Sequence, residues 1–292
     1  MQPFIHLHVH SQYSLLDGQA DIKKLVDKAV KDGMPGMALT DHGNMFGIKE
    51  FANYAKKHNG KVDGKVKDLL RQADEAEAAG DSAAAADFRT KAGEEKSHYF
   101  KLTLRCEVYV ANKSLHHRND KTDRCRHPIV IANTQKRHHN PTKLVSQAWT
   151  EGFYSHPRTD KDALAAHREG LIICSACLGG EIPRLILAGR LDEADASVRW
   201  WKETFGDDYY IELQRHKTDV PGGNRETYEE QQRVNPELMR LARKYDIKVV
   251  ATNDSHFVNA EDAEAHDRLI CISTNNYLND PSRMRHAKQE WF

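Results

Sequence analysis

The sequence predicts an α/β protein built around a parallel sheet. Short apolar segments typical of strands alternate along the chain with longer segments whose apolar residues recur at helical spacing. About seven strand–helix units of this kind follow one another, which is typical of a parallel sheet, either open or closed into a barrel. The chain has 292 residues, of which 39% are hydrophobic and 29% charged, and this composition fits a folded domain with a sizeable core.

The expected strands are short apolar runs. The first covers residues 4–10 and carries a histidine at every second position, and the second, at 36–40, is followed by a turn at Asp41-His42-Gly43-Asn44. The other strands are expected at residues 102–111, 128–132, 171–174, 209–213 and 248–252.

Helices are expected between these strands. Ile22, Leu25, Val26 and Ala29 repeat along one helical face, and Gly33 follows them as a signal for the helix end. A polar segment at 214–232, with Pro221-Gly222-Gly223 inside it, indicates a long loop. Further helices are expected at residues 46–58, 141–149, 182–188, 193–205 and 236–245.

One stretch interrupts the alternation. Residues 64–97 are rich in Ala, Glu, Asp, Lys and Arg, and Val66, Leu69 and Ala73 belong to one helical stripe. A turn at Gly80-Asp81-Ser82 offers a residue that could cap a second helix. We therefore expect an inserted helical hairpin, with a disordered linker as the alternative.

The composition excludes several classes of protein. Lys plus Arg and Asp plus Glu both number 43, so the formal net charge is zero and a strongly basic nucleic-acid coat protein is excluded. No segment approaches the roughly 18 apolar residues of a membrane span, and the first residues lack the features of a secretory signal. Five scattered cysteines argue against a disulfide framework. We expect a cytoplasmic protein without a membrane partner.

Histidine is abundant, at 17 residues, and several histidines fall at predicted strand ends beside other potential metal ligands. The carboxyl ends of parallel strands form the active-site edge of α/β folds, so these side chains are expected to converge. Imidazole, carboxylate and thiol groups together indicate a metal site. The residues are His6, His8, His10, Asp41, His42, Glu107, His127, Cys174, Cys177, Asp254 and His256.

Each motif alone has a simpler interpretation. The histidines of residues 6–10 could be partly buried structural residues, and the segments at 41–43 and 254–256 could be only turns. Glu107 could be an exposed strand residue, and Cys174 with Cys177 could form a redox pair. Their joint position at strand ends favours the metal site. His6 lies one pleat further from the strand end than His8, so we expect it to be a neighbour of the site and not a ligand.

Four segments resemble the PHP (polymerase and histidinol phosphatase) family, and specifically the PHP regions of bacterial DNA polymerase III alpha subunits. They are HLHVHSQYSLLDG at 6–18, ALTDHGNMFG at 38–47, SACLGGE at 175–181 and ATNDSH at 251–256. The resemblance covers nearly the whole chain apart from the hairpin. It implies a distorted (β/α)7 barrel over residues 1–270, with residues 271–292 as the start of a following polymerase region.

The resemblance also implies a cluster of three divalent metal ions with nine protein ligands. Zn²⁺, Mn²⁺ and Fe²⁺ all suit such a mixed set of ligands, and the ligand types do not choose among them. The three carboxylates Asp17, Glu107 and Asp254 are the implied catalytic residues. In the family arrangement His8, His10, Glu107 and Asp254 share one metal, Glu107, His127 and Cys177 share the second, and Asp17, His42 and His256 hold the third.

The implied activity is metal-dependent hydrolysis of phosphodiesters, namely 3′→5′ proofreading exonuclease activity within a DNA-directed DNA polymerase. The polymerising residues of such a subunit lie beyond residue 292, so the chain alone is not expected to polymerise DNA. The implied partners are a DNA primer–template, the remaining polymerase domains of the same subunit, and replicase subunits such as the sliding clamp. Two alternatives stay open: a non-catalytic, metal-stabilised module that supports the polymerase or docks a separate exonuclease, and a phosphomonoesterase of the histidinol-phosphatase type.

Overall fold

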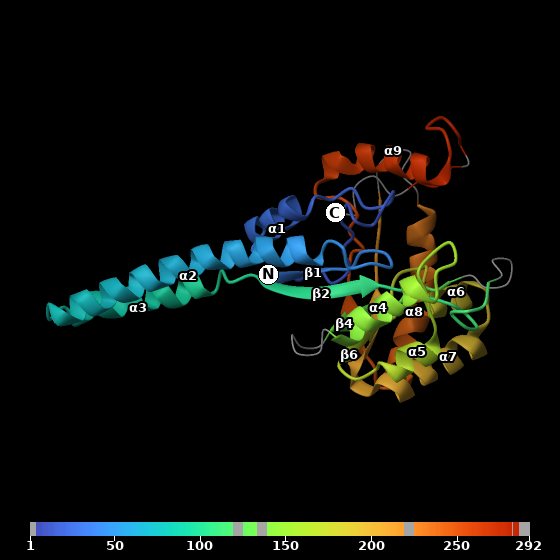
Figure 1. The fold of residues 1–292 in the computed structure, drawn as a ribbon, viewed down its shortest axis with the longest axis horizontal. Coiled ribbons are helices and arrows are strands. Elements are labelled where there is room, and N and C mark those ends of the chain that lie inside the picture. The colour runs from blue at the N-terminus through green and yellow to red at the C-terminus, as the bar shows by residue number, and fades with distance from the viewer. Residues whose placement is uncertain (1–3, 119–124, 133–138, 219–224, 282, 286–292) are drawn as a thin grey trace.

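The computed structural model describes residues 4–118, 125–132, 139–218, 225–281 and 283–285 (Figure 1). It confirms the α/β class, with six strands in one sheet in the order β1-β2-β4-β6-β7-β8 and a separate pair of β3 and β5. The strands are β1 (Gly36–Leu39), β2 (Lys101–Glu107), β3 (Tyr109–Val110), β4 (Ile129–Ala132), β5 (Arg158–Thr159), β6 (Leu171–Cys174), β7 (Tyr209–Leu213) and β8 (Lys248–Ala251).

Helices occupy most of the connections between these strands. Short 3₁₀ turns at Gly206–Asp208 and Ala260–Asp262 precede β7 and the last helix. The helices are α1 (Ile22–Lys31), α2 (Ile48–Ala78), α3 (Ser82–Lys96), α4 (His139–Thr150), α5 (Lys161–Ala166), α6 (Glu181–Leu187), α7 (Leu191–Phe205), α8 (Glu226–Lys244) and α9 (Ala263–Thr274).

The N-terminal segment connects the two edges of the sheet. His6 bridges to Met37 in β1, and Val9 bridges to Ser255, which follows β8. One segment can pair with both edge strands only if the sheet curls, so the fold is a distorted barrel. The expected continuous strand at 4–10 is wrong, because only isolated bridges form there and the regular alternation of side chains is interrupted.

The strand β4 is antiparallel to both of its neighbours, β2 and β6, so the expectation of a fully parallel sheet is wrong at this position. Parallel neighbours need a long crossover connection, whereas antiparallel neighbours do not. Between β2 and β4 the described residues contain the short strand β3 and no helix. The reversal brings the start of β4, next to His127, to the same edge as the end of β2, where Glu107 pairs with Ile129.

Alternation along the strands separates two faces of the sheet. Cys106, Val130, Ile173 and Ile211 face outward and pack in the large core formed with α4 to α8. The inner face carries a much smaller apolar cluster around Ile129, Ile131 and Cys174. Glu107 follows Cys106 in β2 and Glu212 follows Ile211 in β7, so both glutamates face inward, and both are buried. The inner face is therefore polar at the edge where the predicted ligands lie.

Helices α2 and α3 form a long pair that projects from the rest of the fold (Figure 1). The helices expected at 46–58 and in the first arm of the hairpin are one continuous helix of 31 residues, because no break occurs between them. The pair buries Val62, Val66 and Ala92 in a cluster of its own. Its status as an insertion into the fold remains a prediction.

Two further boundaries differ from expectation. Helix α8 begins ten residues before the expected start at Pro236 and shortens the expected loop at 214–232, of which residues 219–224 lie outside the described residues. The buried residues Gln231, Val234, Leu238 and Leu241 keep helical spacing across the proline. The expected domain boundary at residue 270 falls inside α9, and the division itself remains a prediction.

Within the described part of the chain, no helix is both long and apolar enough to cross a membrane.

Candidate metal centre

All nine predicted ligands gather at one edge of the sheet. They come from the N-terminal segment, the turn after β1, the end of β2, the start of β4, the loop after β6 and the segment after β8. Five of them, His8, His10, Glu107, Asp254 and His256, are at least 95% buried. The side chains of Asp17, His42 and His127 are 21–29% exposed, so the group is open to solvent on their side.

The buried part of the centre surrounds the carboxylates of Glu107 and Asp254. Asp254 Oδ1 lies 3.0 Å from His8 Nε2 and 3.2 Å from His10 Nε2. Glu107 Oε2 lies 3.3 Å from His10 Nε2. Four donor atoms from three separate segments therefore point into one small space, and His8, His10 and Glu107 have the mutual spacing of a metal-binding group.

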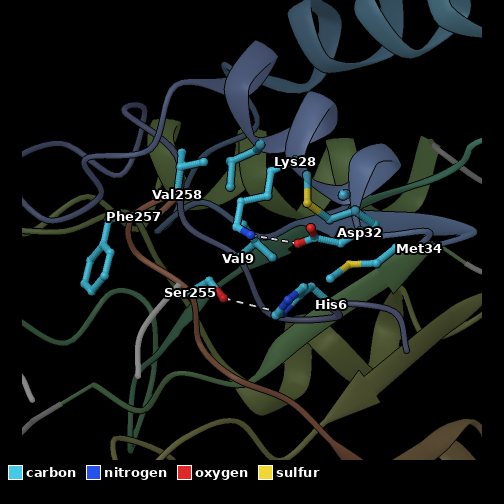
Figure 2. Close-up of a pocket in the computed structure, with 11 residues that line it drawn as sticks. His6, Val9, Lys28, Asp32, Met34, Ser255, Phe257 and Val258 are labelled. Carbon is cyan, nitrogen blue, oxygen red and sulfur yellow. Dashed lines mark hydrogen bonds and ion pairs between the residues drawn. The ribbon is translucent and has the colours of Figure 1, made fainter. Parts of the chain in front are cut away.

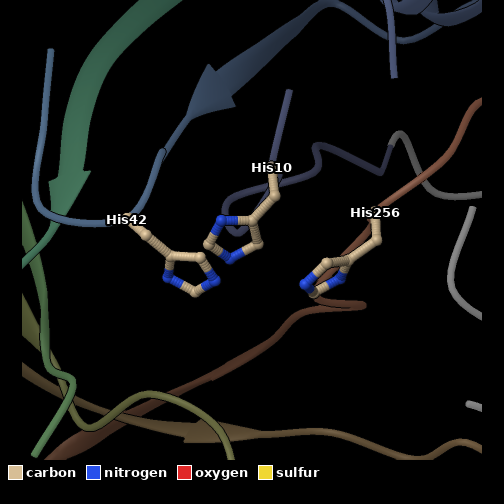
Figure 3. Close-up of side chains that lie close together, drawn as sticks. All are labelled: His10, His42 and His256. Carbon is tan, nitrogen blue, oxygen red and sulfur yellow. The ribbon is translucent and has the colours of Figure 1, made fainter. Parts of the chain in front are cut away.

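A second group lies toward the opening. His42 Nε2 and His256 Nε2 are 2.6 and 2.9 Å from the same oxygen of Asp17, Oδ2. Figure 3 shows the rings of His10, His42 and His256 converging from three segments that are far apart in the sequence. Their nitrogens also have metal-binding spacing, so His10 lies where the two groups meet.

The third group adjoins the other oxygen of Glu107. His127 Nδ1 is 3.4 Å from Glu107 Oε1. A methyl group placed on Gly179 would lie 3.4 Å from Cys177 Sγ and 3.5 Å from His127 Nδ1, so the thiol and this imidazole face the same space. Glu107 therefore has imidazole neighbours on both of its oxygens, which is the position that a bridging carboxylate requires.

Several buried atoms of the centre lack hydrogen-bond partners. Both oxygens of Glu107, Oδ1 of Asp254 and Nδ1 of His42 have no contact that meets hydrogen-bond geometry. They lie instead at ion-pair distance from one another or from other imidazoles, with His42 Nδ1 2.7 Å from Glu107 Oε2. Buried polar groups usually have hydrogen-bond partners, and buried charges are paired or coordinate metals. The donor set of imidazoles, carboxylates and one thiol suits divalent transition metals. The residues present therefore fit a metal cluster.

Comparison with known families agrees with this chemistry. The family model described as "PHP domain" matches residues 6–216.

The chain belongs to the PHP domain family.

Its relatives include DNA polymerase III alpha subunits of several bacteria. This PHP-family chain is 38% identical over 99% of its length to the subunit of Borreliella burgdorferi and 37% identical over 99% to that of Thermus aquaticus. It spans only 21% and 20% of these two relatives. Among solved structures, histidinol phosphate phosphatase from Lactococcus lactis, complexed with zinc, L-histidinol and phosphate, has 11% identity, a TM-score of 0.38 and coverage of 87% and 86% of the two chains. Likeness at this level describes neither the site nor the activity of this PHP-family chain.

Hydrogen bonds from the second ring nitrogen orient three of the histidines. His10 Nδ1 lies 3.0 Å from Ser14 Oγ, and that hydroxyl donates to Asp41. His256 Nδ1 donates to the backbone oxygen of Asp254 at 2.7 Å. Because Nδ1 carries the proton in each case, the Nε2 lone pair faces the centre, as a metal ligand requires.

Glu212 performs the same task for His8, and the sequence analysis missed it. Its Oε1 lies 2.7 Å from His8 Nδ1 and also accepts hydrogen bonds from Gln214 and Thr252. Glu212 is 2% exposed and lies near the end of β7. The sequence offered one sign of this role: Glu212 is an acidic residue within the apolar run at 209–213 and lies near the end of that predicted strand, as the other candidates do on theirs.

His6 lines a separate pocket, and its neighbour there, Ser255, lies between the predicted ligands Asp254 and His256. Figure 2 shows His6 in an apolar pocket with Ser255, whose Oγ is 3.4 Å from His6 Nδ1, and with the ion pair of Lys28 and Asp32 at the edge. Burial lowers the pKa of His6 to about 4, so it is neutral at physiological pH. The irregular backbone between the bridges at His6 and Val9 places these histidines on different sides.

Mutual electrostatics set the charges of the centre. Burial opposes ionisation of Glu107, but His42 and His127 hold its pKa well below the ordinary value. Burial opposes protonation of His42, but Glu107 and Asp17 raise its pKa well above the ordinary value. Burial and the neighbouring His42 and His256 lower the pKa of His10 to about 3, so this imidazole is neutral. Without bound cations, the carboxylates of the centre are therefore ionised, and protonated imidazoles partly balance their negative charge.

The thiol of Cys177 is protonated in the absence of a cation. Burial and the carboxylates of Asp254 and Glu107 raise its pKa well above the ordinary value. Only the thiolate is a good metal ligand, so cation binding must release this proton.

The backbone is constrained in three loops of the centre. Leu16, Ala176 and Asp254 have φ angles of 61°, 66° and 51°, a region that non-glycine residues rarely adopt. Leu16 and Ala176 directly precede the predicted ligands Asp17 and Cys177, and Asp254 is itself one. Unfavourable backbone conformations persist where the surrounding structure requires them, and they often accompany functional sites.

Proposed function

We propose that this chain is a metal-dependent phosphoesterase domain of a DNA polymerase III alpha subunit, and that it removes 3′-terminal nucleotides from DNA. The DNA substrate is inferred from the relatives, which are alpha subunits. The observation that carries the hydrolytic function is the set of buried carboxylate oxygens on Glu107 and Asp254, which imidazole nitrogens surround at 2.7 to 3.4 Å without regular hydrogen-bond geometry.

The nine residues would hold up to three cations in the arrangement implied by the family. Bound divalent cations lower the pKa of water and stabilise the charge that develops during in-line displacement at phosphorus. Zn²⁺, Mn²⁺ and Fe²⁺ remain the candidates. In this assignment His8, His10, Glu107 and Asp254 would hold one cation, Glu107, His127 and Cys177 would hold the second, and Asp17, His42 and His256 would hold the third.

The protein contributes orientation and access. Hydrogen bonds that His8 and His10 donate to Glu212 and Ser14 fix the two rings, so their Nε2 atoms need little rearrangement when a cation binds. Asp17, His42 and His127 are the partly exposed members, so a phosphodiester would approach from their side. The carboxylates of Asp17, Glu107 and Asp254 are the proposed catalytic residues because they lie among the imidazoles of the centre and would balance the charge of bound cations.

The activities of the parent subunit are proposed from the same relatives. We infer that the chain operates within a DNA-directed DNA polymerase together with a primer–template, the other polymerase domains and a sliding clamp. Because the chain spans about a fifth of its relatives' length, we expect the polymerising residues to lie elsewhere in the subunit.

The test is a 3′→5′ exonuclease assay with the full-length subunit on primer–template DNA, with Mn²⁺ or Zn²⁺ added. Inactivating substitutions at the polymerase site remove pyrophosphorolysis as a source of signal. We expect Asp17→Asn and Asp254→Asn to reduce 3′ digestion at least a hundredfold, on the order of losses typical when metal-site groups are removed. Asp63→Asn is the matched control, since Asp63 is exposed on α2.

Equal digestion by wild type and both variants would contradict the proposal. A preference for p-nitrophenyl phosphate over DNA would indicate a phosphomonoesterase. If removal of metal lowers the melting temperature but no metal restores nuclease activity, the centre is a structural module.

A further inference from the structure

Three aromatic side chains lie exposed beside the candidate metal centre. Phe46, Trp149 and Phe153 are 57%, 40% and 48% exposed. The ring centroids of Phe46 and Trp149 are 5.7 Å apart, and those of Trp149 and Phe153 are 5.5 Å apart with planes inclined by 23°. We call these three residues the aromatic platform. Exposed apolar groups that cluster in this way commonly mark binding surfaces.

The platform is attached to the backbone of the metal centre. The indole nitrogen of Trp149 donates to the backbone oxygen of Gly43 at 2.9 Å, and Gly43 directly follows His42. This bond fixes the ring, since its polar atom is satisfied by the backbone. At Gly43 a side chain would lie 2.7 Å from Pro157 and 2.8 Å from Tyr109, and φ is +61°, so the close approach requires glycine.

Further rings continue the surface to the open side of the centre. Tyr109 lies edge-on to His127 at 4.9 Å and stacks on His156 at 4.6 Å with planes inclined by 16°. His127 is one of the partly exposed residues of the centre, and His42 is another. The aromatic platform therefore borders the opening from which a phosphodiester would enter.

We propose that the aromatic platform binds the nucleobases of the single-stranded 3′ end of DNA by stacking. This inference rests on the proposed function and names how the substrate is held. Stacking on aromatic side chains is independent of base identity and does not require positive charge. The formal net charge of the chain is zero, so the chain as a whole has no net attraction to phosphates, and stacking would supply binding that does not depend on it. The platform is attached next to His42, on the partly exposed side of the centre, so the strand end that the proposed reaction digests is the occupant that we infer.

The direct test uses the full-length subunit and a single-stranded oligonucleotide with 5-iodouracil in its last three positions. After irradiation, cross-linked peptides are identified by mass spectrometry. The proposal expects cross-links to Phe46, Trp149 or Phe153, and their loss in a Trp149→Ala, Phe153→Ala double variant. Cross-links that map only to other parts of the subunit overturn it.

Kinetics supply the second readout. Trp149→Ala should raise KM for the oligonucleotide about tenfold, in line with the contribution of one base–aromatic stack, and leave kcat within about twofold. Trp149→Phe should restore most of the lost binding. Hydrolysis of bis(p-nitrophenyl) phosphate, which has no nucleobase, should be unchanged. Tyr99→Ala is the matched control, because Tyr99 is 45% exposed and precedes β2 at the end opposite Glu107.

The failures of the two proposals are distinguishable. If the wild type cross-links at the platform but does not digest DNA, the proposal that the platform binds DNA is supported and the proposal of exonuclease activity is contradicted. Digestion with an unchanged KM in Trp149→Ala would contradict the platform alone. If the double variant instead exposes the domain to proteolysis within the subunit and wild type gives no cross-link at these rings, the surface is an interdomain interface and the inference is wrong.

Discussion

The histidines of the centre are held through contacts outside the ligand set. Glu212 is 204 residues from His8 in sequence, yet its carboxylate lies 2.7 Å from His8 Nδ1. Eight of the nine proposed ligands could be named because their side-chain types are chemically distinctive and fall at predicted strand ends, whereas Asp17 came only from the family resemblance. Their supporting partners could not, because an acidic or hydroxyl residue gains this role only from the tertiary contact.

Replacing Glu212 by glutamine should weaken metal binding by about 10- to 100-fold, the range typical of losing a partner that orients a metal-bound histidine. The amide preserves size but removes the negative charge that orients His8 and strengthens its basicity. Isothermal titration of Mn²⁺ or Zn²⁺ into metal-free protein measures the change. Glu203→Gln, on the exposed side of α7, is the control. An affinity for Glu212→Gln equal to that of the control would contradict this role.

The ionisation pattern predicts an opposite pH response with and without metal. Carboxylates with lowered pKa values, such as Asp17 and Glu107, stabilise the metal-free fold above about pH 4 and lose this contribution as the pH falls. Histidines with raised pKa values, such as His8 and His42, contribute fully below about pH 6.5 and lose the contribution as the pH rises through their folded-state pKa. The metal-free centre therefore contributes most to the free energy of unfolding between about pH 4 and about pH 6.5.

Metal binding requires deprotonated imidazoles and the Cys177 thiolate, so the affinity for metal increases as the pH rises above about 6.5. We predict that the melting temperature of chelator-treated protein falls from pH 6 to pH 8.5, while the increase caused by added Mn²⁺ grows. Differential scanning calorimetry in matched buffers measures both. A metal-induced increase that is constant, or largest at acid pH, would contradict the assigned protonation states.

At the level of elements, the alternation of apolar segments correctly predicted most strands and helices. Two departures have physical causes. The segment at 4–10 bridges two edges of a curled sheet and therefore cannot form a regular ladder with either. The strand β4 reverses because no crossover helix precedes it within the described residues. The missing helical pattern between residues 111 and 128 was the available sign of this reversal.

The projecting pair of α2 and α3 is anchored at its base by Asn59. This side chain is 5% exposed, donates to the backbone oxygen of Phe100 at 3.0 Å and accepts from its nitrogen at 2.9 Å. Asn59→Ala leaves both backbone groups unpaired, and we expect a loss of roughly 2–4 kcal/mol in the free energy of unfolding. Urea denaturation followed by circular dichroism tests this value, with the exposed Asn53→Ala on the same helix as control. A difference below about 0.5 kcal/mol between the two variants would show that Asn59 is not an anchor.

At the level of the whole molecule, the fold serves to bring short segments from across the chain to one edge. The predicted ligands run from His8 to His256, and the sheet together with the bridge between Val9 and Ser255 brings their segments to this edge. The pattern of residue types therefore allowed the site to be predicted before the path of the chain was known. The distances, the buried unpaired atoms and the exposed aromatic platform depend on the folded arrangement and required the structure.

The central claim is that this edge is a multinuclear metal centre. Its most direct test is elemental analysis of the full-length subunit after reconstitution with Mn²⁺, Zn²⁺ or Fe²⁺ and removal of free metal, in wild type and in Glu107→Gln. The account predicts close to three divalent cations per wild-type chain and a loss of at least one in the variant, because Glu107 is the proposed bridging ligand. Less than one cation per wild-type chain with every metal, or an unchanged content in Glu107→Gln, would contradict it.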